Sequence, residues 1–198
     1  MRSLRMIWTL SGFLAISMIF NQSSADEHKI WAAGQYTFSD ELGGFTIRAI
    51  SGSGTQTDPF TITEEFNDVA PTTLIIRTDK TTQLSPTTEN AMLFHLRIVA
   101  INGSGHSWTE FGFELQEQLG KASDYSDGLS FYQPGDKTGM IHSNLFATYD
   151  DNFEPYDRMI FREGKVDPKA NASFDFPIGD FTPKRTFYLV QEPRIPST

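Results

Sequence analysis

The chain of 198 residues contains no cysteine. Disulfides, thiolate nucleophiles, zinc–thiolate sites and lipid attachment through an N-terminal cysteine all need that side chain, so each of them is excluded. A domain without cysteine is held together by its hydrophobic core, to which a bound metal ion can add stability. These absences remove several classes of function and leave binding proteins and carboxylate-based enzymes.

Histidine is also scarce, and the motifs of common hydrolases are absent. The four histidines are His28, His95, His106 and His142. None of them lies in a His-Glu-x-x-His element, and the chain has no Gly-x-Ser-x-Gly element. His95 falls on the polar side of an alternating segment, which is typical of a histidine on the surface of a sheet. We therefore expect no zinc site and no catalytic triad.

Positively charged residues are fewer than negatively charged ones. The chain has 16 Lys+Arg against 25 Asp+Glu, a net charge of −9. Without Arg2 and Arg5, which precede the apolar run described next, the counts are 14 and 25 and the net charge is −11. A strongly acidic protein is a poor partner for nucleic acid or anionic lipid. We expect neither of these partners, and the excess of carboxylates suits divalent cations or simply solubility.

One long apolar run is present, and it lies at the N-terminus. Residues 6–20 follow two arginines, and small residues at Ser23 and Ala25 fit a signal-peptide cleavage site. The run is shorter than the roughly 20 apolar residues of a membrane-spanning helix, although an uncleaved anchor is the alternative. We predict a cleaved signal peptide over residues 1–25, a secreted or periplasmic location, no membrane span after cleavage, and one domain over residues 26–198.

Alternation of apolar and polar residues recurs along the rest of the chain. It is found in residues 44–50, 72–78, 91–101, 158–162, 171–178 and 185–191. Segments rich in Gly, Pro, Asn and Asp separate these runs, as in tight turns between short strands. The pattern predicts an all-β fold, an antiparallel β-sandwich (Ig-like or jelly-roll-like) of about eight to ten strands. The 17 phenylalanines would give it a bulky core.

Residues 107–120 fit either a strand or a helix. As a strand, the segment places alternate residues from position 109 inward and Trp108 outward. As a helix it has capping residues at both ends, but Gly112 would cost about 1 kcal/mol in a helix interior. We favour the strand, with a helical turn after Gln116.

Several segments, in order, resemble the exported β-sandwich domains of bacterial PEP-CTERM proteins. They are "NGSGHSWTEFGFELQE", "SDGLSF", "DRMIFREGKVDPKANASFDFPI" and "RTFYLVQEP", and the resemblance covers about residues 90–193. It implies a β-sandwich with an export-associated surface or matrix role, and it implies no catalytic residue. The chain ends at "EPRIPST", without the apolar helix and basic tail that anchor such proteins, so we expect an unanchored relative.

Acidic residues gather in two segments, "SDYSDG" (123–128) and "YDDNFEPYD" (149–157). Carboxylate oxygens are the ligands that calcium prefers, although the spacing is not that of an EF-hand. If the two loops lie at the same end of the sandwich, their aspartates predict a calcium site; the alternative is a solvated loop pinned by its aromatic rings. The aspartates concerned are Asp124, Asp127, Asp150, Asp151 and Asp157.

Five aromatic residues lie in or next to polar loops. Exposed rings can stack on the apolar faces of sugars, with polar groups nearby to hold the hydroxyls. We predict that these residues contact a glycan, with packing at strand ends as the alternative. They are Trp108, Tyr125, Tyr132, Tyr149 and Tyr156.

Glu110 and Glu114 are the candidate carboxylates for catalysis. On a strand they share a face, with Cα atoms about 13 Å apart at ~3.3 Å per residue. Some β-sandwich glycosidases use a Glu-x-Asp-x-Glu strand, but Gly112 occupies the central position here. A retaining hydrolase needs carboxyl groups about 5 Å apart, and the alternative interpretation is a solvated polar face.

These features predict an exported, non-enzymatic binding or matrix protein that contacts extracellular polysaccharide or an envelope protein. The role would be adhesion at the bacterial envelope, with calcium as the one cofactor that the sequence suggests. Two alternatives remain open. One is a subunit of a larger envelope or surface assembly, which would pair through an exposed edge strand. The other is a glycan-active hydrolase that uses Glu110 and Glu114.

Overall fold

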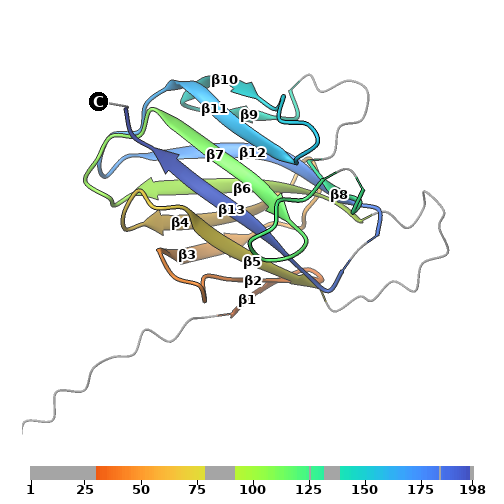
Figure 1. The fold of residues 1–198 in the computed structure, drawn as a ribbon. Coiled ribbons are helices and arrows are strands. Elements are labelled where there is room, and N and C mark those ends of the chain that lie inside the picture. Colours follow the sequence, from red (N-terminus) through yellow and green to blue (C-terminus); the bar gives the residue numbers. More distant parts are fainter. Residues whose placement is uncertain (1–29, 79–91, 125, 132–138, 183, 197–198) are drawn as a thin grey trace, which may run out of the picture.

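The computed structural model shows two β-sheets packed face to face (Figure 1). It describes residues 30–78, 92–124, 126–131, 139–182 and 184–196. The described residues contain strands and turns and no helix, and the predicted β-sandwich is therefore confirmed. Within these ranges no helix is long and apolar enough to cross a membrane. The signal peptide predicted over residues 1–25 lies outside the described residues.

Thirteen strands are assigned in the described residues, more than the eight to ten expected, because four of them have four residues or fewer. The seven-stranded sheet has the order β1 (Ile30–Ala33), β2 (Tyr36–Ser39), β5 (Thr72–Thr78), β13 (Thr186–Arg194), β7 (Glu110–Gln116), β11 (Arg158–Gly164) and β10 (Phe146–Asp150). The six-stranded sheet has the order β3 (Phe45–Ser51), β4 (Phe60–Phe66), β6 (Met92–Asn102), β12 (Asn171–Asp180) and β8 (Leu129–Ser130), with β9 (His142–Ser143) also paired to β12.

One pair of neighbouring strands departs from the antiparallel pattern. β4 and β6 run parallel, with Phe60 opposite Leu96 and Phe66 opposite Asn102. Between them the chain crosses to the other sheet as β5 and then returns. Because one strand of the opposite sheet intervenes, the returning strand has the same direction as β4. The sandwich is therefore mixed at this pair and antiparallel at the other strand pairs of the described chain.

Aromatic side chains fill the space between the sheets. The ring of Phe174 lies 4.6 Å from that of Phe111 and 4.9 Å from that of Phe161, measured between centroids. The Phe113 and Phe176 rings are 4.9 Å apart. All five side chains are buried, and such tilted and edge-on contacts stabilise beyond the area that they bury. The phenylalanine-rich core thus stabilises a domain that has no cysteine and therefore no disulfide.

Residues 110–116 form strand β7, as favoured from the sequence, but the flanking residues differ from expectation. Trp108 has no exposed surface, because a bridge to Val166 turns the chain just before the strand and points the indole into the core. Its Nε1 donates a hydrogen bond to Ser104 Oγ at 3.1 Å. The outward position predicted for Trp108 is therefore wrong.

The helical turn expected after Gln116 is also wrong. The chain instead forms a short reversal closed by a bridge between Gln118 and Lys121. Gly120 sits in it with φ of 81°, which glycine adopts at no steric cost. The main-chain N–H of Gly120 donates to Gln116 Oε1 at 2.7 Å, which fixes the turn.

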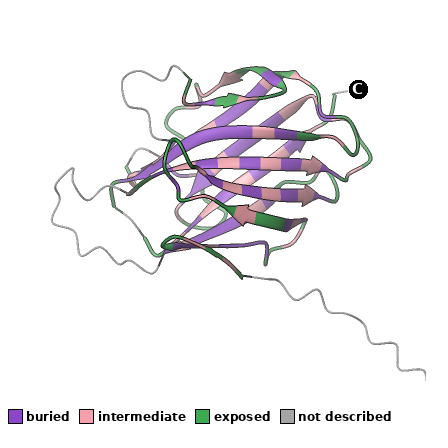
Figure 2. Ribbon diagram, turned by 180° about the vertical axis from the view of Figure 1, so that it is seen from behind, coloured by how far each residue is buried: buried purple, intermediate pink, exposed green. Residues whose placement is uncertain are grey.

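Figure 2 shows buried and partly buried residues alternating along strands of the six-stranded sheet, as expected when one face of a sheet packs on the core and the other meets solvent. Along β4, buried and half-buried residues alternate strictly. Hairpin β9–β10 then closes one flank of the sandwich, because β9 pairs with β12 of one sheet and β10 pairs with β11 of the other. Both pockets described below adjoin β9.

Candidate functional site

A polar pocket of about 160 Å³ lies on the outer face of the six-stranded sheet. Three neighbouring strands supply its charged and titratable side chains. We call it the face pocket and define it by His95 and Arg97 from β6, Asp175 from β12, His142 from β9, and Gln56 from the loop before β4.

The register of the sheet places these side chains in one row. Arg97 lies directly opposite Asp175 on one side of β12, and His142 lies opposite the same aspartate on the other side. His95 is two residues from Arg97 and therefore on the same face of β6. A carboxylate on the central strand is thus flanked by a basic side chain from each neighbouring strand.

Asp175 is the buried centre of this row. Arg97 Nε donates to Asp175 Oδ1 at 2.7 Å, and His142 Nε2 lies 3.5 Å from Asp175 Oδ2. The Asp175 residue is 8% exposed, whereas the side chains of Arg97 and His142 are 41% and 54% exposed. The acceptor therefore lies at the bottom of the pocket, and the donors line its mouth.

His95 is a half-buried base of the pocket. Burial lowers the pKa of His95, because it disfavours the charged ring, and the negative charge of Asp175 opposes this shift. The main-chain N–H of His95 donates to the carbonyl of Gly54 at 2.9 Å, which ties β6 to the loop that carries Gln56. At neutral pH the His95 ring is uncharged and can both donate and accept a hydrogen bond.

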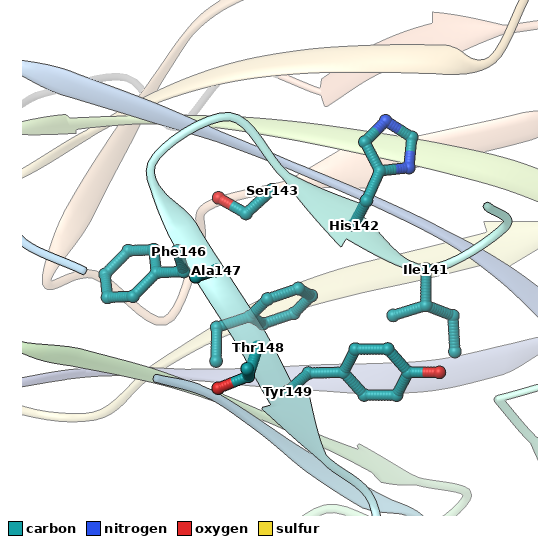
Figure 3. Close-up of a pocket in the computed structure, with 8 residues that line it drawn as sticks. Ile141, His142, Ser143, Phe146, Ala147, Thr148 and Tyr149 are labelled. Carbon is teal, nitrogen blue, oxygen red and sulfur yellow. The ribbon is translucent and has the colours of Figure 1, made fainter. Parts of the chain in front are cut away.

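A second, mainly apolar pocket of about 340 Å³ opens on the flank of the sandwich (Figure 3). In Figure 3 the ring of Tyr149 extends from β10 toward Ile141, while the imidazole of His142 points away on the other side of β9. We call this the flank pocket; its walls are Ile141, His142, Ser143, residues 146–149 and Phe161. His142 belongs to both pockets, so the polar and the apolar pocket adjoin at β9.

The aromatic residues predicted to bind a glycan have different surroundings. Tyr149 is half-buried in the flank pocket, with its ring centroid 6.0 Å from that of Phe161. Tyr156 is exposed, but it borders neither of these pockets. Trp108 lies in the core and offers no face to a sugar, which corrects its predicted role. Tyr125 and Tyr132 lie outside the described residues.

The two acidic segments meet in space, as the calcium hypothesis required. Asp124 forms a bridge with Tyr156, and the main-chain N–H of Asp157 donates to the carbonyl of Ser123 at 3.0 Å. Burial, followed by the charges of Asp127 and Asp124, raises the pKa of Asp157 to about 7. Three of the five aspartates are therefore close enough to repel one another.

Asp150 has other neighbours. Its Oδ1 accepts hydrogen bonds from the main-chain N–H and the Nδ2 of Asn152, both at 3.1 Å, and these bonds lower its pKa. Its Oδ2 lies 3.8 Å from Arg162. Asp151 follows it and is half-buried. In the described part of the chain, no group of three or more His, Asp or Glu side chains could hold a metal ion, and calcium binding stays a prediction.

Glu110 and Glu114 lie on the outer face of the seven-stranded sheet, among arginines. Glu110 is 3.4 Å from Arg162 and 3.5 Å from Arg194, and Glu114 is 3.4 Å from Arg158. We call this row the charge ladder; its members are Glu110, Glu114, Arg158, Arg162, Glu192 and Arg194.

Glu192 lies directly opposite Gly112 on the next strand and supplies the central carboxylate that β7 lacks. Its carboxylate is 2.7 Å from Arg194 and 3.9 Å from Arg158. Each glutamate of the charge ladder is thus ion-paired, and none of them lines the face pocket or the flank pocket. This geometry suits a structural network better than an acid and base pair.

The face pocket is not predictable from the local sequence pattern. His95 lies on an outer face, as predicted, but no pattern in the sequence connects it with His142 or Asp175. The one available signal is Asp175 in "FDFPI", a charged residue between two phenylalanines on a strand whose register the sequence does not give.

Comparison with protein-family models, curated proteins and solved structures finds no match to this chain. The resemblance to PEP-CTERM-type domains therefore stays a prediction.

Proposed function

We propose that this protein is an exported, non-enzymatic binding protein that contacts extracellular polysaccharide through the face pocket and the flank pocket. The observation that carries the proposal is that His142 borders both pockets. A saccharide presents apolar ring faces and polar hydroxyls within one small unit. A polar pocket adjoining an apolar one matches that mixture. Export follows from the sequence prediction for residues 1–25.

The groups at the junction can serve as donors, acceptors and an apolar wall. Arg97 and His142 present N–H donors at the mouth of the face pocket, and Gln56 adds an amide that both donates and accepts. In the flank pocket, Tyr149 offers a ring against which a sugar face can pack. The proposed contact therefore runs across β9, from Arg97 to Tyr149.

Binding is favoured over hydrolysis because the face pocket holds a single carboxylate among its described lining residues. Asp175 is already engaged by Arg97 and His142. Glycoside hydrolysis generally uses two carboxyl groups on either side of the scissile bond. The charge ladder has several carboxylates, but arginines neutralise them.

The test is affinity electrophoresis of the exported chain in gels that contain neutral or acidic polysaccharides. Retardation by at least one polysaccharide is expected, and Arg97→Ala and Tyr149→Ala should each abolish or strongly reduce it. Arg158→Ala, on the opposite outer face, is the matched control and should migrate like the unmodified chain. The proposal fails if no polysaccharide retards the protein, or if the control loses as much affinity as Arg97→Ala.

A further inference from the structure

Arg97 has donor capacity that the fold does not use. Its Nε donates to Asp175 Oδ1, and within the described ranges its two terminal nitrogens make no hydrogen bond to the protein. The side chain is 41% exposed, so those nitrogens are accessible from the pocket mouth. A guanidinium binds a carboxylate, sulfate or phosphate group through two parallel N–H···O bonds. The pocket therefore presents a guanidinium group that could bind the oxyanion of a ligand.

The other charged groups around the pocket determine its net charge. β6 and β9 contribute His95 and His142 in addition to Arg97, and β12 contributes Asp175. The loop before β4 contributes neutral Gln56 and also carries Asp58.

On the outer face of the two strands beyond β6, the charged residues are already paired with each other. Arg48 of β3 lies 2.7 Å from Glu65 of β4. In the pocket itself, Arg97 and Asp175 cancel, so protonation of the two histidines makes the site positive.

We infer, on the basis of the proposed function, that the bound saccharide carries an oxyanion. That group, a carboxylate or a sulfate ester, would sit on the terminal nitrogens of Arg97, between His95 and His142. The affinity would then rise as the pH falls and the histidines gain charge.

The direction of the pH effect follows from linkage. A protonated imidazole stabilises a bound anion, so the complex takes up protons and its affinity increases through the histidine titration range, near pH 6.5 for an unperturbed ring. His95 titrates at lower pH than that, because its pKa is lowered by burial. A uronate keeps its charge down to about pH 4. The effect should therefore be visible between about pH 4.5 and pH 7.5.

The overall charge of the protein works against the same ligand. At a net charge of −9, the chain as a whole repels an anionic polymer, and salt screens that repulsion. Local contacts in the face pocket must therefore carry the affinity. Raising the salt concentration should weaken the pocket contact and the general repulsion together, so the experiment is done at one fixed ionic strength.

The test compares charged oligosaccharides with uncharged counterparts of the same backbone. Titration calorimetry of the exported chain would use oligogalacturonate and its methyl ester, and a sulfated galactan oligosaccharide and its desulfated form, at pH 5 and pH 7.5. At least one charged probe should bind about tenfold more tightly at pH 5, which is about 1.4 kcal/mol. The uncharged forms should show no pH dependence. Whichever charged probe binds shows whether the group recognised by the pocket is a carboxylate or a sulfate ester.

Variants distinguish binding in the face pocket from attraction to charges elsewhere on the protein. Arg97→Gln should abolish binding of the charged probe. Arg97→Lys keeps the charge but cannot form two parallel hydrogen bonds to one oxyanion, so it should weaken binding. His142→Gln keeps a hydrogen-bonding side chain that does not titrate, so the pH dependence should become smaller. Arg158→Gln removes the same charge from the opposite face and should leave the affinity unchanged.

Each outcome has a distinct meaning. If charged and uncharged probes bind equally at both pH values, the proposed function stands and this inference is overturned. If no probe and no other polysaccharide binds, the proposed function itself fails. If Arg158→Gln loses as much affinity as Arg97→Gln, the attraction is not located in the face pocket, and the inference is wrong.

Discussion

The two outer faces of the sandwich use similar side chains in different ways. On the seven-stranded sheet, each glutamate of the charge ladder contacts an arginine. On the outer face of the six-stranded sheet, the buried carboxylate of Asp175 lies between Arg97 and His142. The first face has its charges balanced between neighbouring strands. The second has more donors than acceptors, and they surround a pocket. Surplus donors, and not the number of charged residues, distinguish a candidate site from a structural network.

The interior supplies a third setting for a carboxyl group, with no cation beside it. Glu64 of β4 is fully buried between the sheets, and Gln191 Nε2 of β13 donates to its Oε2 at 2.7 Å. Burial, opposed by the Gln191 bond and reinforced by the charge of Asp40, raises the pKa of Glu64 to about 8. Among the described residues, Glu64 has no ion pair. At neutral pH it is therefore mostly protonated.

The largest expected effect is the pH dependence of folding stability that this carboxyl group causes. Between its unfolded pKa near 4.3 and its folded pKa of about 8, the folded chain binds more protons than the unfolded chain. The free energy of unfolding therefore falls as the pH rises through this window. Asp157 and Asp180, with pKa values raised to about 7 and about 6, act in the same direction.

Chemical denaturation from pH 4.5 to pH 8.5 measures this slope. Glu64→Gln, which keeps the shape and the hydrogen-bonding capacity, should lower the slope and stabilise the protein at pH 8.5 by a few kcal/mol. Asp150→Asn is a control on the surface. The pKa of Asp150 is lowered, so any stabilisation from it is lost below its usual pKa and does not contribute in this window. Equal slopes for Glu64→Gln and the unmodified chain would show that Glu64 ionises freely inside the fold.

The sequence predicted the sandwich because alternation is a local property. Each period-two run could be recognised by itself, and the runs at 72–78 and 171–178 became β5 and β12. The partners of those strands could not be predicted, because register depends on contacts between segments far apart. Arg97 and Asp175 are 78 residues apart and meet only through the pairing of β6 with β12.

The errors have the same origin. Trp108 follows the alternation of β7 when it is counted along the sequence, but a bridge to Val166, 58 residues away, turns it inward. The parallel alignment of β4 and β6 also depends on a strand that belongs to the other sheet. Local pattern thus predicted which residues form strands, and the site arises from how those strands are arranged.

An intermediate effect is expected when the acceptor of the face pocket is removed. Asp175→Asn keeps the size of the side chain but takes the negative charge away from Arg97 and His142. Because Arg97 is partly exposed, water compensates some of the loss, and the free energy of unfolding should fall by about 1–2 kcal/mol. Denaturation at pH 7 measures the loss. Stability equal to that of the unmodified chain would show that the charge of Asp175 contributes no net stability.

The smallest effect is expected in the charge ladder, and it decides the hydrolase alternative as well. In Glu114→Gln, the new amide oxygen can still accept from Gln116 Nε2, which lies 2.8 Å from Glu114 Oε1 in the unmodified chain. Arg158 also keeps Glu192 as a partner at 3.9 Å. Partly exposed ion pairs contribute little, so the free energy of unfolding should change by less than about 1 kcal/mol.

Glycan binding by Glu114→Gln should equal that of the unmodified chain, because the ladder and the face pocket lie on opposite sheets. The unmodified chain could instead hydrolyse a polysaccharide that neither Glu110→Gln nor Glu114→Gln hydrolyses. That result would reverse the roles assigned to the two outer faces. The balanced face would then be the active one, and the arginines of the ladder would hold two catalytic carboxyl groups. Unchanged binding and no turnover would leave the charge ladder as a structural network and the face pocket as the site.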